Sequence, residues 1–200
     1  MTDKKEFKEF KNLYKCVSSL VRCRGYIPDK MGQEAIDSIM KLAKNMEAAD
    51  YIRHRNMIAV AGMQGSGKST LIRNFYNIPD DILNICVERG EKIPVFISES
   101  KELGDKEYRA KRVYFDEGYG RAEEDIDPFD IAKKSRDKNN IYLELFVPTK
   151  YFDSDGRGFA LLPGFEKNSA HTFDDEYNSI IEYTLHFSSA VLLAVDNLTL

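Results

Sequence analysis

One short stretch of this 200-residue chain has the residue types and spacing that bind nucleotide phosphates. Residues 62–70 satisfy the P-loop pattern G-x-x-x-x-G-K-[ST] without a substitution. Glycines in such a loop leave room for backbone N–H groups to turn toward the phosphates. We expect Lys68 to reach the β- and γ-phosphate oxygens and Ser69 to place its hydroxyl on Mg²⁺. The predicted nucleotide contacts in the loop are Gly62, Met63, Gln64, Gly65, Ser66, Gly67, Lys68, Ser69 and Thr70.

The segments on either side of the loop are those that a phosphate-binding loop requires. Residues 57–61 form an apolar run of strand length, and residues 69–76 carry Leu71, Ile72 and Phe75 at helical spacing. A helix that begins at this point directs the positive end of its dipole at the bound anion. A glycine-rich turn between two core elements would not explain Lys-Ser at the helix entrance, so we interpret residues 57–76 as strand, P-loop and helix.

Composition sets broad limits on size and partners. Two hundred residues suit one main domain with a small addition rather than two full domains. The net charge of −4 is small, and acidic and basic residues are mixed along the chain. Nothing in this pattern forms the basic surface of a nucleic-acid-binding protein, so we expect no nucleic acid partner.

Cysteine usage indicates a reducing compartment, and hydropathy gives no sign of a membrane-spanning segment. Cys16, Cys23 and Cys86 lack metal-ligand spacing, and an odd number does not suggest a disulfide framework. Charges run through the first thirty residues, and no apolar stretch approaches the roughly 18 residues of a membrane span. We predict a cytoplasmic location, with peripheral membrane contact left open.

Two amphipathic helices are expected before the loop. Apolar residues repeat at helical spacing over residues 3–24 and again from Ala35 to Met46, and residues 25–29 interrupt the pattern. We therefore expect a helical hairpin over residues 1–54 and a nucleotide-binding domain over residues 55–200. The hairpin packs on that domain or on further helices, or its first helix is a basic membrane anchor.

The segments after the P-loop alternate in type, as in an α/β fold. Strands are predicted at residues 93–97 and 112–115, and short helices at 127–137 and 171–186. Residues 141–147 alternate as a half-buried strand and could form an antiparallel hairpin with the buried strand 159–162. Residues 190–195 are continuously apolar, which is typical of a strand buried on both faces. We predict a three-layer α/β/α P-loop fold with a mostly parallel sheet that is incomplete at the C-terminus.

Four segments together point to a known family. The phosphate loop has Gln64 at its third place, and Pro94 precedes an apolar strand within residues 89–97. A strand, a turn and a second strand lead into residues 161–164. Residues 190–197 then look like the buried strand that follows. With helices before the loop, roughly residues 50–200 resemble the nucleotide-binding domain of the dynamin-like large GTPases. Residues 161–164, Leu-Leu-Pro-Gly, are similar to that family's Asp-x-Pro-Gly motif.

The resemblance implies a GTPase that binds GTP with Mg²⁺ and self-associates across its nucleotide face, with a membrane or a partner as its target. It implies that Gly164 offers a backbone N–H to the γ-phosphate and that Gln64 orients the attacking water. A loop glutamine is as often a solvated residue.

Two departures from the family pattern weaken the hydrolysis prediction. Leu161 stands where the family has an Asp that reaches Mg²⁺ through water, and Glu91 stands where a first-switch Thr is expected. The nearest hydroxyls downstream are those of Ser98 and Ser100. The guanine-reading Asn/Thr-Lys-x-Asp motif does not occur and would lie beyond residue 200.

Two alternatives to an active GTPase therefore stay open. One is a nucleotide-binding scaffold that does not hydrolyse. The other is an ATPase in which Asp196, after the apolar run 191–195, is a Walker B residue that holds Mg²⁺. The remaining candidates are interpreted as surface or structural: an acidic run, Glu123, Glu124, Asp125 and Asp127, and the histidines His54, His171 and His186.

Overall fold

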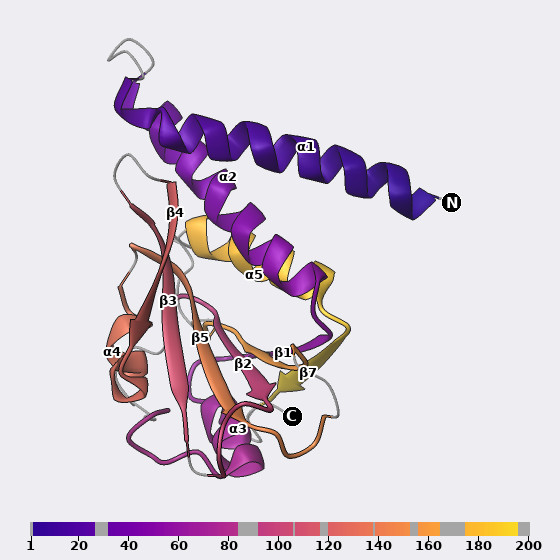
Figure 1. The fold of residues 1–200 in the computed structure, drawn as a ribbon, viewed down its shortest axis with the longest axis vertical. Helices are drawn as coiled ribbons and strands as arrows, with labels where there is room; N and C mark the ends of the chain where they lie inside the picture. The colour runs from indigo at the N-terminus through magenta and orange to yellow at the C-terminus, as the bar shows by residue number, and fades with distance from the viewer. Residues whose placement is uncertain are drawn as a thin grey trace.

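The computed structural model describes residues 2–26, 32–83, 92–105, 107–116, 120–137, 139–152, 156–164 and 175–195. Figure 1 shows two long helices leading into a sheet that has further helices on both faces. The helices are α1 (Thr2–Arg22), η1 (Arg24–Tyr26), α2 (Gly32–Arg53), α3 (Lys68–Tyr76), η3 (Pro128–Asp130), α4 (Ile131–Lys134) and α5 (Asp175–Phe187). The strands are β1 (Met57–Gly62), β2 (Val95–Ser100), β3 (Arg109–Asp116), β4 (Gly120–Ile126), β5 (Asn140–Pro148), β6 (Gly158–Leu161) and β7 (Ala190–Ala194).

The described strands form one mixed sheet of seven strands in the order β4-β3-β5-β2-β6-β1-β7. Pairing is parallel for β1–β6, β1–β7 and β2–β5, and antiparallel for β2–β6, β3–β4 and β3–β5. The predicted α/β class is confirmed. The predicted hairpin between residues 141–147 and 159–162 is wrong, because β2 lies between β5 and β6. The antiparallel hairpin is β3–β4 instead, and its second strand has no apolar pattern that would reveal it.

Alternating side chains place two cores on opposite faces of the sheet. Val60 and Leu161 point to the face that α3 and α4 cover, where Ile72 and Ile131 meet them. Their chain neighbours Ala59, Ala61, Ala160 and Leu162 point to the other face, which α2 and α5 cover. The sheet is therefore the middle of three layers.

The predicted helical hairpin is present as α1 and α2. Val17 and Val21 of α1 pack against Ala43 and Met46 of α2, as the helical spacing indicates. The second half of α2 then continues into the core on the sheet and lies beside α5 (Figure 1). The hairpin thus packs directly on the α/β layers.

Burial of two strands differs from the prediction. The strand 141–147, expected to be half-buried, is covered on both faces, and Tyr142 and Glu144 are as buried as their neighbours because α2 lies over them. The strand 190–194, expected to be buried, is exposed along its length, and Leu193 is 67% exposed. β5 is central in the sheet and β7 is at an edge of the described sheet, so position decides burial here rather than composition.

Candidate phosphate-binding site

The loop predicted to bind phosphate joins the end of β1 to the start of α3, and its glycines have backbone shapes that other residues adopt poorly. Gly65 and Gly67 have φ angles of 78° and 85°, in the left-handed region. A side chain at Gly62 would collide with the carbonyl oxygen of Ala194, because β7 runs beside the end of β1. All three predicted glycines are therefore required by the local geometry.

The Lys68 side chain lies within this loop. Its Nζ donates to the carbonyl oxygens of Gly62 at 3.1 Å and Met63 at 2.8 Å, and the residue is only 5% exposed. Burying an ammonium group is costly unless charged or polar partners compensate it. Carbonyl dipoles provide part of that compensation, and a phosphate at the loop would provide a full opposite charge.

The start of α3 presents backbone donors at the same place. The N–H of Leu71 bonds the carbonyl of Gly67 at 2.9 Å, which closes the first turn. Gly67 has no side chain to cap the helix, and the first turn contains no acidic residue. The N–H groups of the first turn have no acceptor within the helix itself, so this end of α3 favours an anion. Ser69 is the second residue of the helix and is half-buried.

Strand β6 brings Gly164 to the loop from about a hundred residues away. The N–H of Leu162 bonds the carbonyl of Val60 at 3.1 Å and so extends the β1–β6 pairing toward the loop. A Cβ on Gly164 would lie 2.8 Å from the backbone of Gln64 and 3.0 Å from the Lys68 Nζ. The structure therefore places Gly164 against the P-loop, and the Gln64 side chain there is exposed.

The structure gives a physical reason for the missing carboxylate at position 161. Leu161 is paired in register with Val60 and Val95 and is fully buried in the core on the α3 face. A carboxylate at this position would enter an apolar core. In the part of the chain that is described, no group of three His, Cys, Asp or Glu side chains could hold a metal ion.

The two downstream hydroxyls are not brought to the loop. β2 runs antiparallel to β6, and Ser98 pairs with Gly158 at the start of β6, so both Ser98 and Ser100 lie at the far end of the sheet. Glu91, His171 and Asp196 lie outside the described residues. The acidic run around Glu123 is exposed, as interpreted, and His54 is exposed and pairs with Asp50 at 3.4 Å.

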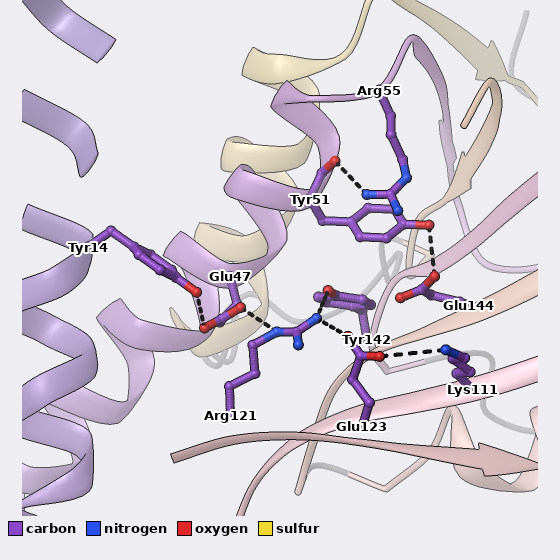
Figure 2. A network of polar contacts seen from close by, with 9 residues as sticks. All are labelled: Tyr14, Glu47, Tyr51, Arg55, Lys111, Arg121, Glu123, Tyr142 and Glu144. Carbon is purple, nitrogen blue, oxygen red and sulfur yellow. Dashed lines mark hydrogen bonds and ion pairs between the residues drawn. The ribbon is translucent and has the colours of Figure 1, made fainter. Parts of the chain in front are cut away.

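A polar network that the sequence did not predict ties the helical hairpin to the sheet (Figure 2). The Glu47 carboxylate, on α2, accepts from the Tyr14 hydroxyl at 2.6 Å and pairs with Arg121 of β4 at 2.8 Å. Arg121 also donates to the Tyr142 hydroxyl at 3.2 Å and pairs with Glu123 at 2.6 Å. Burial raises the pKa of the Glu47 carboxyl, although Tyr14 and Arg121 act to lower it. No periodic pattern marks these residues, since they come from four separate elements.

Comparison with known proteins gives matches to solved structures only. No family model and no curated protein matches the sequence. Two similar solved structures are both described as an oligomerised bacterial dynamin pair that provides a mechanism for long-range sensing and tethering of membranes. They are 17% and 15% identical to this chain, with TM-scores of 0.44 and 0.43. The matches cover 96% of this chain but only 30% and 35% of those chains, so the chain spans about a third of their length.

Among the described residues, none of the helices combines the length and apolar character needed to cross a membrane.

Proposed function

We propose that this protein binds a nucleoside triphosphate with Mg²⁺ through residues 62–70. The observation that carries the proposal is the buried Lys68 ammonium, held inside a glycine loop between a strand end and a helix start. That arrangement collects a positive charge, backbone N–H groups and a helix dipole at one point. These three features bind phosphate together and serve no evident packing role.

In this proposal each residue has a distinct task. Lys68 exchanges its contacts with the loop carbonyls for phosphate oxygens and neutralises the charge that develops during transfer. The Ser69 hydroxyl would hold Mg²⁺, and the ion would supply positive charge to stabilise the phosphates. Gly164, which lies against the loop, offers its N–H to the γ-phosphate. Gln64, whose side chain is exposed at the loop, orients the attacking water.

We further propose that the nucleotide is GTP and that the protein is a dynamin-like GTPase, a hydrolase that converts GTP to GDP and phosphate. The sequence supports this assignment, because Gln64 and the Pro163-Gly164 pair are similar to motifs of the dynamin-like family. Nucleotide-dependent homo-oligomerisation and peripheral contact with a membrane follow from the same resemblance and are proposed with it.

A second candidate function is a nucleotide-binding scaffold that hydrolyses slowly or not at all. The burial of Leu161 in the core favours it, because no carboxylate can reach the metal from that position. The ATPase with Asp196 as its metal ligand is the third candidate, and position 196 lies outside the described residues.

Binding and turnover, measured on the same preparation, separate these candidates. Fluorescent GTP and fluorescent ATP are each titrated with and without Mg²⁺, and each bound probe is then displaced by unlabelled GTP or ATP. Phosphate release is followed in a single turnover. Displacement by GTP alone with release of phosphate supports the GTPase, and tight binding without release supports the scaffold. Preferential displacement by ATP supports the ATPase, and no Mg²⁺-dependent binding of either nucleotide refutes all three.

A further inference from the structure

A second polar cavity lies at the opposite end of the sheet from the P-loop. It has a volume of about 290 Å³, roughly that of nine or ten water molecules in the liquid. Its walls come from the α2–β1 connection, β2, β3, β5 and the start of β6. The lining residues include Arg55, Ser98, Ser100, Arg109, Lys111 and Phe146.

The strand register fixes the position of the cavity. Ser98 of β2 pairs with Gly158, which in turn pairs with Met57, the first residue of β1. The P-loop begins at Gly62, at the other end of β1. Five residue steps at about 3.3 Å each separate the two ends by roughly 16 Å. The cavity is therefore distinct from the phosphate loop.

Three cations from two separate parts of the chain face this space. Arg109 and Lys111 are two apart on β3 and so share a face of the sheet, and Arg55 comes from the connection above that face. Arg55 stacks on the Tyr51 ring, with its guanidinium carbon 3.7 Å from the ring centroid, and donates to the Tyr51 carbonyl at 3.4 Å (Figure 2). These contacts hold the guanidinium in place at the cavity wall.

The carboxylates of the cavity wall are engaged elsewhere or open to solvent. Glu99 accepts from the backbone N–H groups of residues 150–152 at 2.8 to 3.0 Å, which satisfies its charge within the protein. Glu102 pairs with Arg109 at 2.9 Å, and both side chains are more than half exposed. Lys111 pairs with Glu123 at 3.6 Å, also at the surface. Exposed pairs of this kind are weak, so a bound anion can compete for both cations.

A buried hydroxyl, that of Ser98, lies at the wall of the cavity. Ser98 is 2% exposed, and among the described residues its Oγ makes no hydrogen bond of ordinary geometry. The Tyr51 hydroxyl lies within reach of Ser98, whose hydrogen bonding acts to lower the pKa of Tyr51, and it donates its own proton to Glu144 at 3.2 Å. The Ser98 hydroxyl therefore has at most one weak partner in the protein, and a ligand at the cavity wall would offer it an acceptor.

We propose that this cavity binds the phosphate group of a small molecule. Arg55, Arg109 and Lys111 surround the group from two sides, and the hydroxyls of Ser98 and Ser100 donate to it. Five donor side chains exceed what the two oxygens of a carboxylate can accept, and they suit the several oxygens of a phosphate. The half-buried Phe146 ring in the same wall offers an apolar surface for a small organic substituent.

The test uses the full chain with Lys68→Ala, which removes the P-loop cation and leaves the far cavity intact. Inorganic phosphate and phenyl phosphate are titrated by calorimetry. We expect one saturable site for each, with phenyl phosphate tighter because of Phe146. Adding Lys111→Gln lowers the affinity at least about tenfold, the effect of losing a charged hydrogen bond. Adding Arg112→Gln, the same charge change on the next residue of β3, leaves it unchanged.

A third variant distinguishes a loss of phosphate binding from a loss of folding. Ser98→Ala adds no bulk and removes at most a weak contact with the Tyr51 hydroxyl, so we expect it to weaken phosphate binding several-fold with little change in the melting temperature. Absence of a saturable site in the Lys68→Ala protein overturns the proposal, and so does equal binding in the Lys111→Gln and Arg112→Gln proteins. Neither result bears on nucleotide binding at the P-loop, because that site is already disabled in every protein compared.

Discussion

The two ends of this sheet carry two different kinds of site. At the P-loop end, the groups that we propose to bind phosphate are backbone N–H groups and one lysine, and all of them except the Gly164 N–H lie within residues 62–70. At the far end, the donors are side chains from Arg55, Ser98 and Lys111, on three separate elements. The first site is built from local conformation and the second from tertiary packing. This difference predicts which substitutions damage each end.

The largest effect is expected from Leu161→Asp, which places the family's carboxylate at the P-loop end. Leu161 is fully buried between Val60 and Val95, so the charge is uncompensated and we expect a loss of about 3 to 5 kcal/mol in the free energy of unfolding. Urea denaturation measures it. Leu71→Asp on α3, a residue 47% exposed, is the control and changes stability by less than about 0.5 kcal/mol. A stable Leu161→Asp protein with tighter Mg²⁺-dependent nucleotide binding contradicts this account of the site.

Gly164→Ala tests whether backbone contact shapes the P-loop end. The added methyl lies 2.8 Å from the Gln64 backbone, and overpacking of this kind costs about 1 to 3 kcal/mol. We expect nucleotide affinity to fall about tenfold while phosphate binding at the far cavity is unchanged. Gly104→Ala is the control, since its methyl meets only the flexible Glu107 side chain at 3.5 Å. Equal affinity in the two variants would show that Gly164 does not touch the loop in solution.

Glu144→Gln tests the electrostatics beside the far cavity. Burial raises the pKa of the Glu144 carboxyl, and the charge of Glu123 raises it further, although Arg55, Lys111 and the Tyr51 hydroxyl lower it. The folded protein then binds the proton more tightly than the unfolded chain. Stability is greatest below the ordinary glutamate pKa and falls as pH rises through the raised value. We expect urea titrations from pH 4 upward to show a smaller fall for Glu144→Gln. If the stability of the wild-type and Glu144→Gln proteins falls equally with pH, Glu144 is not the source of this pH dependence.

The smallest effect is expected from Ser98→Ala in the absence of ligand. Because the Ser98 hydroxyl has at most a weak contact with the Tyr51 hydroxyl, we expect its removal to leave the free energy of unfolding nearly unchanged. Ser135→Ala is the matched control: Ser135 is equally buried, and its hydroxyl donates to the Ala132 carbonyl at 3.1 Å. That variant loses about 1 kcal/mol. Equal losses of stability in the Ser98→Ala and Ser135→Ala proteins would mean that the Ser98 hydroxyl makes a full hydrogen bond in solution.

The contrast between local conformation and tertiary packing also explains which features could be predicted from the sequence. The P-loop could be predicted because its geometry depends on glycines and a lysine at fixed offsets, and so could α1 and α2, because their packing face repeats at helical spacing. β5 and β7 could not be predicted correctly. Their burial depends on sheet order, and α2, about ninety residues earlier in the chain, covers the polar side of β5.

The residues of the candidate sites also fall into those that the sequence could predict and those that it could not. Position 164 was found through its resemblance to a family motif, and the structure adds the close approach to Gln64. The Glu47–Arg121 pair and the far cavity have no sequence signal, because the residues that form them are separated by dozens of positions and do not share a period. The packing of α2 on the sheet and the register of the strands bring them together.

The most direct test of the central claim is equilibrium binding of fluorescent GTP and ATP, with Mg²⁺, to the wild-type and Lys68→Ala proteins. Loss of a buried charged contact predicts an affinity for the preferred nucleotide at least about tenfold lower in Lys68→Ala. Lys101→Ala, an exposed lysine after β2, should bind as the wild type does. Equal affinities in all three proteins, or no binding to any, would contradict nucleotide binding by this loop.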